Sequence, residues 1–297
     1  GLGDVYKRQA YDLPNDRAYA ETCASIGLFM WARRMLKLEL NSDYADVMEL
    51  ALYNGISSGM SEDGKQYFYV NPLEVNPAKV HQRYDLKHVR SSRVTWFGCA
   101  CCPPNVARIL TSLEKYSYDI SDDSNSIAIH LYLCGQIIMS DDSVWNITGK
   151  YLTDGKIEIT YSGEEKDFTL RLRNPGWSTA CEIRINGLRI KAESEQGYFY
   201  ILRKWKNGDT VQLKFGITAQ LVYANTYVED DAGKVAVMRG PVVFCLEEAD
   251  NGKNLSELMI GTIESHCENS VILNGYREHT MDSICLLYTS DAADDKA

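Results

Sequence analysis

Between Asn15 and about Tyr118 the apolar residues recur at helical spacing. Positions three and four residues apart share one face of a helix, so a stripe of apolar residues at that spacing marks a face that packs against other parts of the chain. Three such stripes consist of Leu28, Trp31, Met35 and Leu38; of Tyr44, Val47, Met48, Ala51, Leu52 and Ile56; and of Val106, Ile109, Leu110 and Leu113. The pattern predicts a mainly α-helical segment.

Capping residues indicate where these helices begin and end. Asn15 or Asp16 and the 41–43 run Asn-Ser-Asp are expected to start helices, because short polar side chains satisfy free backbone N–H groups. The 103–104 proline pair fits the first turn of the third helix. Glycines and turn residues between Gly55 and Gly64 are expected to end the second helix.

After about Asp119 the hydrophobic period changes to two, which is typical of half-buried strands. Turn residues separate the strands, and Asn186-Gly187 is a strong signal for a two-residue hairpin. The alternating apolar residues are Ile127, Ile129, Leu131 and Leu133; Ile157, Ile159 and Tyr161; Phe168, Leu170 and Leu172; Ile183 and Ile185; and Val211, Leu213 and Phe215. Short strands in this number predict an antiparallel β-sandwich. The stretch from Lys234 to Glu248 is expected to begin a further sheet that is cut off near Ile284.

Both ends of the chain resemble a translated sequencing adapter. The hexapeptide DVYKRQ at residues 4–9 can be encoded by GATGTGTATAAGAGACAG, and the reverse complement of that DNA, read one base in, encodes CLLYTS, which is present at residues 285–290. We therefore expect residues 1–9 and 285–297 to be artefacts and the native segment to be an internal piece of a longer protein.

The patterns together predict an α+β multidomain chain: a partial helical domain at 10–118, a β-sandwich at 119–220 and a partial second β-rich domain at 221–284. The composition, with 45% hydrophobic and 24% charged residues, is that of a globular protein. The net charge of −10 argues against nucleic acid as a partner, and the chain contains no apolar run of membrane-spanning length. The oligomeric state leaves no readable signature.

Cysteines are concentrated in the helical part. Nine occur, or eight without Cys285, and the helical part holds Cys23, Cys99, Cys101 and Cys102. Adjacent cysteines cannot form an unstrained disulfide, so metal binding or thiol chemistry is favoured for this group. The remaining four, expected to be small buried hydrophobes, are Cys134, Cys181, Cys245 and Cys267.

A cluster of thiolates suits Zn²⁺, which is bound tetrahedrally by S, N or O ligands. Residues before a proline avoid α geometry, so Cys102 is expected to be extended and Cys101 to lie in a loop just before a helix start. There the helix dipole would lower the pKa of a thiol, which is the environment of a nucleophile. A carboxylate also stands two residues from Cys23, at Glu21. On an ideal helix these two would point in opposite directions, so their joint binding of one metal ion requires a departure from helical geometry.

Two strings, YDLPNDRAYAETCAS at 11–25 and CACCPPNVAR at 99–108, resemble the signatures of bacterial β-L-arabinofuranosidases of glycoside hydrolase families 127 and 146. MRGPVVF at 238–244 is similar to their later β-domain. The resemblance covers about residues 10–284 and implies the C-terminal part of an (α/α)6 barrel followed by antiparallel β-sandwich domains. It also implies a retaining exo-glycosidase that releases β-L-arabinofuranose, or a related furanose, from plant-derived glycans.

The resemblance further implies roles for individual residues. Cys101 would be a zinc-bound nucleophile and Tyr69 a sugar contact, and the Zn²⁺ ligands would be Glu21, Cys23, Cys101 and Cys102. The partner would be an oligosaccharide or glycan substrate. The family's acid/base glutamate would fall at Val5, inside the adapter-like peptide, so this piece is expected to be inactive by itself.

Alternatives to these assignments stay open. The chain could be a non-catalytic, zinc-structured carbohydrate-binding scaffold, whereas a thiol redox protein is disfavoured because no CxxC motif stands in a βαβ context. Tyr69 could equally serve packing alone. Other polar and aromatic residues have plain structural interpretations: Glu49 a solvated helix position, His81 and His88 surface or loop residues, and Trp96 and Phe97 core. Unpaired thiols favour the bacterial cytoplasm, while a periplasmic or secreted location stays open.

Overall fold

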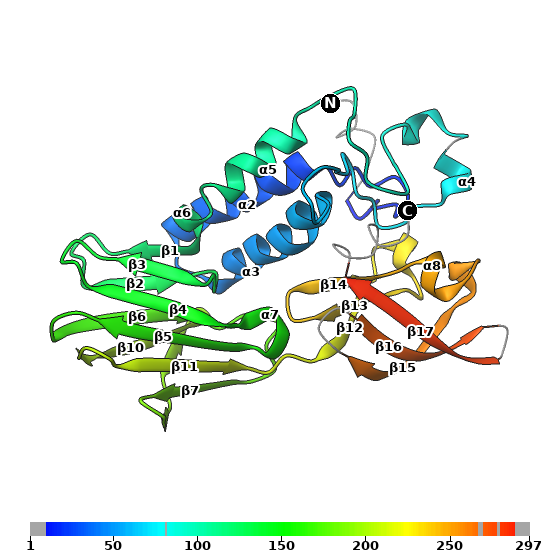
Figure 1. Cartoon of the computed structure of the whole chain (residues 1–297). Helices are drawn as coiled ribbons and strands as arrows, with labels where there is room; N and C mark the ends of the chain where they lie inside the picture. The colour runs from blue at the N-terminus through cyan, green and yellow to red at the C-terminus, as the bar shows by residue number, and fades with distance from the viewer. Residues whose placement is uncertain (1–9, 81, 267–269, 278–279, 289–297) are drawn as a thin grey trace. The chain divides into compact units, whose positions relative to one another are not determined.

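The computed structural model describes residues 10–80, 82–266, 270–277 and 280–288 (Figure 1). The chain divides into two compact units, each built from segments that are distant in sequence. Unit 1 comprises 1–27, 51–106 and 219–297, and unit 2 comprises 28–50 and 107–218. The predicted α+β class, with a helical part followed by antiparallel sheets, is confirmed.

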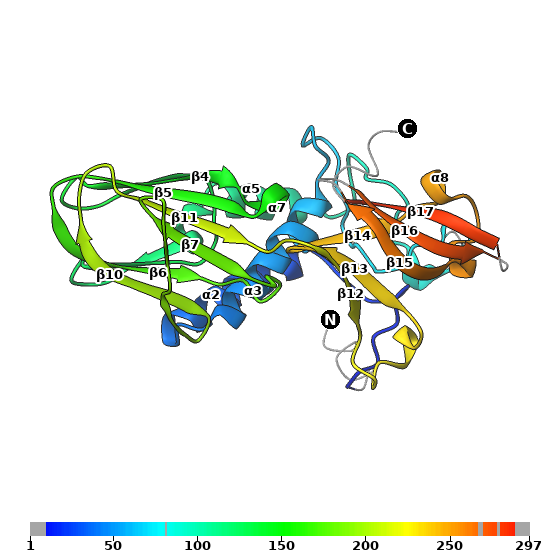
Figure 2. The same cartoon turned by 90° about the horizontal axis from the view of Figure 1, so that it is seen from below.

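Unit 2 is a sandwich of two sheets, as the alternating pattern predicts (Figure 2). One sheet has the order β1-β2-β6-β10-β9, with the bounds Tyr118–Ile120, Ser126–Ile129, Lys166–Arg173, Tyr198–Trp205 and Glu193–Glu195. The other has the order β3-β4-β5-β11-β7-β8, with the bounds Gly135–Ile138, Val144–Lys150, Lys156–Ser162, Thr210–Phe215, Cys181–Ile185 and Leu188–Ile190. The strand pairs of these sheets are antiparallel, as predicted, apart from the parallel pair of β2 with β6.

The inward residues of both sheets form one apolar core. Burial alternates along strand β5, where Ile157, Ile159 and Tyr161 are buried and the residues between them are not. The predicted turns are also found. Asn186 and Gly187 both have positive φ, 51° and 80°, as a two-residue hairpin between β7 and β8 requires. Short helix α7, Tyr151–Asp154, ends at left-handed Gly155 before β5.

The helices are α2 (Thr22–Leu38), α3 (Ser42–Leu50), α5 (Cys102–Leu110) and α6 (Glu114–Ser117). The start at Ser42 and the proline pair in the first turn of α5 confirm two predictions. A helix start at Asn15 or Asp16 is wrong: the Pro14 carbonyl accepts hydrogen bonds from two later amides in a single turn, and α2 begins only at Thr22.

The buried face of α2 is not the one that the sequence predicts. Ile26, Phe29 and Leu36 are buried, whereas 45–82% of the surface of the expected core residues Leu28, Trp31 and Leu38 is exposed. The buried face was hidden in the sequence by Arg33, whose charge made it look polar. Arg33 is buried and donates to Asp119 through Nη1 at 2.6 Å.

The second predicted helix continues beyond α3 in other geometries. A π-helical turn, η1 (Ala51–Ile56), and a 3-10 turn, η2 (Ser57–Gly59), complete it. The π turn carries Asn54, whose side chain donates to the Pro241 carbonyl at 2.8 Å and accepts from the Val243 N–H at 2.8 Å. Pro241 lies in the turn that joins two strands of the sheet in unit 1, and Val243 lies in the second of these strands.

That sheet has six antiparallel strands in the order β12-β13-β14-β17-β16-β15, with the bounds Ala219–Tyr223, Val235–Arg239, Val242–Leu246, Thr280–Tyr288, Ser270–Arg277 and Met259–His266. β17 continues past Ile284 and pairs Leu286 with Leu246, so the predicted end of the native sheet falls within this strand. Short helical turns are α4 (Pro77–Val80), η3 (Tyr84–Leu86), η4 (Glu229–Asp231), α8 (Glu248–Asn251) and η5 (Leu255–Glu257). In the described part of the chain no helix has the length and apolarity needed to span a membrane.

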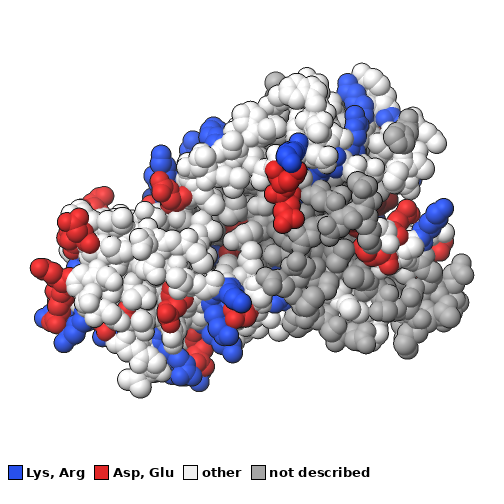
Figure 3. Space-filling model, viewed as in Figure 1, with Lys and Arg blue, Asp and Glu red and all other residues white. Residues whose placement is uncertain are grey.

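Positive and negative side chains are interspersed on one face of the described surface. On the face shown in Figure 3, Lys and Arg side chains lie next to Asp and Glu side chains over the described residues. Pairs such as Lys204 with Glu165 and Arg184 with Glu182 belong to this pattern.

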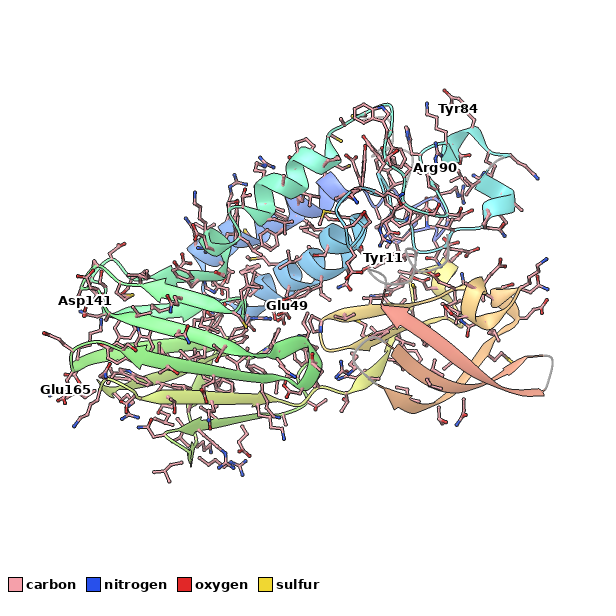
Figure 4. The ribbon with its side chains drawn as sticks, viewed as in Figure 1. Tyr11, Glu49, Tyr84, Arg90, Asp141 and Glu165 are labelled. Atoms are coloured by element: carbon pink, nitrogen blue, oxygen red, sulfur yellow. The ribbon has the colours of Figure 1, made fainter. Side chains whose placement is uncertain are left out.

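Glu49 corrects a further expectation, because it is 1% exposed instead of solvated. It comes from α3 (Figure 4) and accepts hydrogen bonds from the Tyr151 hydroxyl at 2.7 Å and the Trp177 indole at 2.8 Å. It also pairs with the fully buried guanidinium of Arg173, which Asp46 pairs with as well. The carboxylate thus joins α3 to the sandwich within unit 2.

Replacing Glu49 by Ala leaves Arg173 buried with a single carboxylate partner, which is costly. We expect the unfolding free energy of unit 2 to fall by about 3 kcal/mol. Urea unfolding followed by tryptophan fluorescence measures the change. Glu165→Ala, which removes an exposed ion pair with Lys204, is the control and should change stability little. Equal effects of the two substitutions would contradict the role given to Glu49.

His130 makes the stability of unit 2 dependent on pH. It is fully buried between the Tyr198 hydroxyl at 2.8 Å and Asp119 at 3.0 Å, and burial lowers its pKa. As the pH falls, the His130 imidazole therefore takes up a proton at a higher pH in the unfolded chain than in the folded chain. The unfolding free energy should decrease below about pH 6.5 by at most ~1.4 kcal/mol per pH unit. Urea midpoints at a series of pH values test this. His130→Gln should flatten the profile between about pH 6.5 and 5, and an unchanged slope in that variant would refute the assignment.

Candidate functional site

The candidate site residues of unit 1 lie at the N-termini of two helices. The Glu21 carbonyl accepts the Ser25 N–H at 3.0 Å, and the Cys101 carbonyl accepts the Asn105 N–H at 3.3 Å. These are the first helical hydrogen bonds of α2 and α5, so Glu21 and Cys101 occupy the N-cap positions. Free N–H groups and the positive end of each helix dipole favour negative charge at such ends.

An isolated β-bridge resolves the conflict in the spacing of Glu21 and Cys23. Glu21 pairs with Val70, and the Thr22 N–H donates to the Tyr69 carbonyl at 3.2 Å. Glu21 is therefore extended, while Cys23 already lies in the first turn of α2. The change of geometry between them allows both side chains to approach one point.

Cys102 differs from its predicted conformation. It is the first residue of α5 and not an extended residue before the helix, although Pro103 follows it. The first turn of a helix tolerates the proline pair because the N–H groups there have no partner within the helix. Cys102 is also 1% exposed, so its sulfur points into the unit.

Four predicted ligands come together. One potential ligand atom from each of Glu21, Cys23, Cys101 and Cys102 lies within 4.8 Å of the others. The Sγ of Cys102 is 3.7 Å from that of Cys23 and 3.8 Å from that of Cys101, and Cys101 Sγ is 3.5 Å from Oε1 of Glu21. These distances exclude disulfides, and Cys23, Cys101 and Cys102 are all free.

The donor set fits a tetrahedral metal ion. Bonds of about 2.3 Å from Zn²⁺ to sulfur place two tetrahedral sulfurs about 3.8 Å apart, and a carboxylate oxygen at about 2.1 Å would lie about 3.6 Å from a sulfur. The measured separations of 3.7, 3.8 and 3.5 Å match these values. Three soft sulfurs and one carboxylate at these separations therefore suit a metal ion of the zinc type.

The pKa values of the thiols contradict the expectation of a lowering by the helix dipole. Burial raises the pKa of the Cys101 thiol to about 11 and also raises that of Cys102. Desolvation and the crowding of several potential anions outweigh the helix N-termini. A bound cation would oppose this effect and favour the thiolate form of the sulfurs.

Aromatic rings surround the Cys101 side of the cluster. The Tyr69 hydroxyl lies 3.7 Å from Cys101 Sγ, and the ring of His88 stacks on Tyr69 at 5.5 Å. Tyr19 approaches both rings edge-on, at 6.4 and 6.2 Å, and is 54% exposed. Phe97 packs beneath with Tyr67 and Cys102. The predicted position of Tyr69 beside the cluster agrees with either a sugar contact or packing.

The structure confirms some of the weaker expectations and corrects others. Phe97 is core as predicted, but Trp96 is 66% exposed, which corrects its assignment to the core. His88 is half-buried against the aromatic rings, while His81 lies outside the described residues. Cys99 is exposed and outside the four-residue group.

The cysteines outside the helical part also differ in their exposure to solvent. Cys134 is exposed, contrary to prediction, whereas Cys181 and Cys245 are partly buried, and burial raises the pKa of each thiol to about 12. The side chain of Cys267 lies outside the described residues.

One residue that touches the cluster was missed in the sequence. Asn105 Nδ2 lies 3.0 Å from Cys23 Sγ. Asn105 stands four residues after Cys101, and this spacing places both on the same face of a helix, which could have indicated in the sequence that Asn105 lies near the cluster.

Comparisons with known proteins agree with this layout. Domain models of the β-L-arabinofuranosidases of glycoside hydrolase family 127 match the chain: the catalytic domain at 4–115, the middle domain at 126–217 and the C-terminal domain at 219–279. A non-reducing end β-L-arabinofuranosidase of Bifidobacterium longum subsp. longum is 41% identical over an alignment of 252 residues, and the match covers 82% of this chain and 38% of that protein.

Solved structures are similar over nearly the whole chain. The crystal structure of a family 127 β-L-arabinofuranosidase from Geobacillus stearothermophilus has a TM-score of 0.83 and 42% identity, and covers 94% of this chain and 49% of its own. A second family 127 β-arabinofuranosidase has a TM-score of 0.82 and 31% identity, with coverages of 96% and 49%. The chain thus spans 38% of the curated relative and 49% of each of these two structures.

Metal binding by the cluster can be tested on the purified chain. We expect one Zn²⁺ per chain after dialysis, measured by elemental mass spectrometry. Cys102→Ala and Glu21→Gln each remove one donor, and each should weaken affinity by more than the ~10–100-fold typical of outer-shell changes. Cys134→Ser removes an exposed thiol outside the group and should leave the zinc content unchanged. An equal zinc content in all variants would show that the metal ion binds at a site other than this cluster.

Proposed function

Because this chain belongs to glycoside hydrolase family 127, we propose that it supplies the nucleophile-bearing part of a retaining exo-glycosidase. The enzyme would release β-L-arabinofuranose, or a related furanose, from plant-derived glycans. The convergence of three thiols and one carboxylate at two helix N-termini carries the proposal. The names of the similar enzymes support the choice of sugar.

Cys101 is the sulfur best placed to attack a sugar. Cys102 is 1% exposed and Cys23 accepts a hydrogen bond from a side-chain amide, whereas half-buried Cys101 lies beside the Tyr69 hydroxyl. In the first step a bond forms from Cys101 Sγ to the anomeric carbon as the glycosidic C–O bond breaks. In the second step water displaces the sulfur, and two inversions give net retention.

Protonation of the leaving oxygen requires a general acid, which also serves as the base for the attacking water. The expected family position for this group corresponds to Val5, which lies outside the described residues. No other carboxylate is assigned the role. Glu21 is used as a cluster ligand, because its Oε1 is 3.5 Å from the nucleophilic sulfur.

We propose Zn²⁺ as the ion that Glu21, Cys23, Cys101 and Cys102 hold. When bound, it supplies the positive charge that keeps the sulfurs deprotonated and stabilises a departing thiolate. The protein adds the partial positive charge of two helix N-termini to the same point. Tyr69, whose hydroxyl is 3.7 Å from Cys101 Sγ, is proposed to orient the sugar over the nucleophile.

The nucleophile assignment predicts both a loss of activity and a site of covalent labelling. Replacement by Ser of the cysteine equivalent to Cys101 in the full-length Bifidobacterium relative should lower kcat by more than about 1,000-fold on an aryl β-L-arabinofuranoside. An epoxide analogue of the sugar should label Cys101 of this chain, as peptide mass mapping would show.

The neighbouring exposed thiol provides the matched control. The epoxide should label the Cys99→Ser variant to the same extent as the unaltered chain, whereas it should not label the Cys101→Ser variant. Zinc binding without labelling, together with retained turnover in the relative's variant, would overturn the nucleophile assignment and favour a zinc-structured carbohydrate-binding scaffold.

A further inference from the structure

Asn105 connects the two halves of the cysteine cluster. Its backbone N–H donates to the carbonyl of Cys101 at 3.3 Å, and its side-chain Nδ2 lies 3.0 Å from Sγ of Cys23. One residue of α5 therefore contacts the N-cap of its own helix and a sulfur at the start of α2. Cys23 and Asn105 are 82 positions apart in the sequence, so only the folded chain creates the contact.

The chemistry of the contact determines which end of the amide faces the sulfur. A deprotonated sulfur has no proton to donate and can only accept hydrogen bonds. The NH₂ end of the Asn105 amide is the matching donor, and the carbonyl end would face the same negative charge unfavourably. The observed orientation, with Nδ2 toward Cys23 Sγ, is the one that a thiolate ligand requires.

The three sulfurs of the cluster thus differ in their surroundings. Cys23 has a short N–H···S contact, and Cys102 is almost completely buried. The contacts of Cys101 Sγ are longer: 3.7 Å to the Tyr69 hydroxyl and 3.5 Å to Glu21. A hydrogen bond withdraws electron density from a sulfur, which lowers its nucleophilicity and fixes its position.

We propose that Asn105 is a positioning residue that holds Cys23 as a fixed, less reactive ligand, and thereby leaves Cys101 as the reacting sulfur. The inference rests on the proposed metal site and nucleophile, and it adds a reason why one of three clustered thiols reacts. Asn105 itself touches no substrate and exchanges no proton. It acts through the sulfur of Cys23 and through the shared geometry of α2 and α5.

Alkylation of the metal-loaded chain tests the proposal directly. The chain is loaded with Zn²⁺, treated with limiting iodoacetamide, and the modified cysteines are quantified by peptide mass spectrometry. In the unaltered chain Cys101 should be modified faster than Cys23. In Asn105→Ala the ratio of Cys23 to Cys101 modification should rise about 3–10-fold, the amount expected from one hydrogen bond. Zinc affinity should fall about 10–100-fold, as for other outer-shell partners.

A spectroscopic measurement gives a readout that a merely structural role would not move. Co²⁺ replaces Zn²⁺, and the sulfur-to-cobalt charge-transfer band is recorded. Loss of an N–H···S bond raises the energy of the sulfur lone pair, so the band should move to longer wavelength in Asn105→Ala. Asn105→Asp keeps the shape but places a carboxylate beside the sulfur, and it should weaken Co²⁺ binding more than Ala does. Circular dichroism verifies that both variants fold.

Asn125→Ala in unit 2 is the matched control, since it removes an exposed amide remote in sequence from the cluster and should change none of these values. If the unaltered chain shows the charge-transfer band and both Asn105 variants keep its position and the alkylation ratio, the role proposed for Asn105 is overturned, while the proposed metal site stands. Failure of the unaltered chain to show any charge-transfer band would instead remove the proposed metal site, and this inference with it.

Discussion

The convergence of the N-termini of α2 and α5 is the constraint on which the candidate site depends. Each helix contributes its N-cap residue and a cysteine from its first turn, so four donor atoms approach one point without a long loop. The bridge between Glu21 and Val70 ends the extended segment just where the helix begins. Moving either helix start by one residue would turn a donor away, because successive helical side chains differ by about 100° in direction.

Electrostatics explain why this arrangement suits a cation. Three thiols and a carboxylate gathered in a partly buried site oppose one another's ionisation, and burial raises the pKa values of Cys101 and Cys102. Two helix ends supply only partial positive charge, which does not offset desolvation. A divalent ion at the centre would reverse the balance. The distances from Cys102 to the other two sulfurs and from Cys101 to Glu21, 3.5 to 3.8 Å, are close to those of a tetrahedral site. The proposed reactivity of Cys101 is therefore linked to the proposed metal ion.

Unit 2 illustrates a different use of buried charge. Arg173 is fully buried and pairs with Asp46 and Glu49, while Arg33 pairs with Asp119. These pairs connect α3 and α2 to strands of the sandwich inside the unit. Such ion pairs contribute little net stability compared with apolar packing, but the loss of one partner is costly, so they make the docking of each helix specific.

The amino-acid sequence by itself determined the types of the elements, most strand faces and the hairpin at Asn186-Gly187, whereas the set of four clustered donors followed from the family resemblance. These features depend on local periodicity and turn chemistry, which short stretches encode. It could not show that Arg33 and Glu49 are buried, since their partners lie 86 and 124 residues away and charge normally indicates exposure. The tertiary structure alone decided that Glu21 is extended beside helical Cys23, that burial raises the thiol pKa values, and that Asn105 reaches Cys23. Each of these depends on distances between segments that only long-range packing sets.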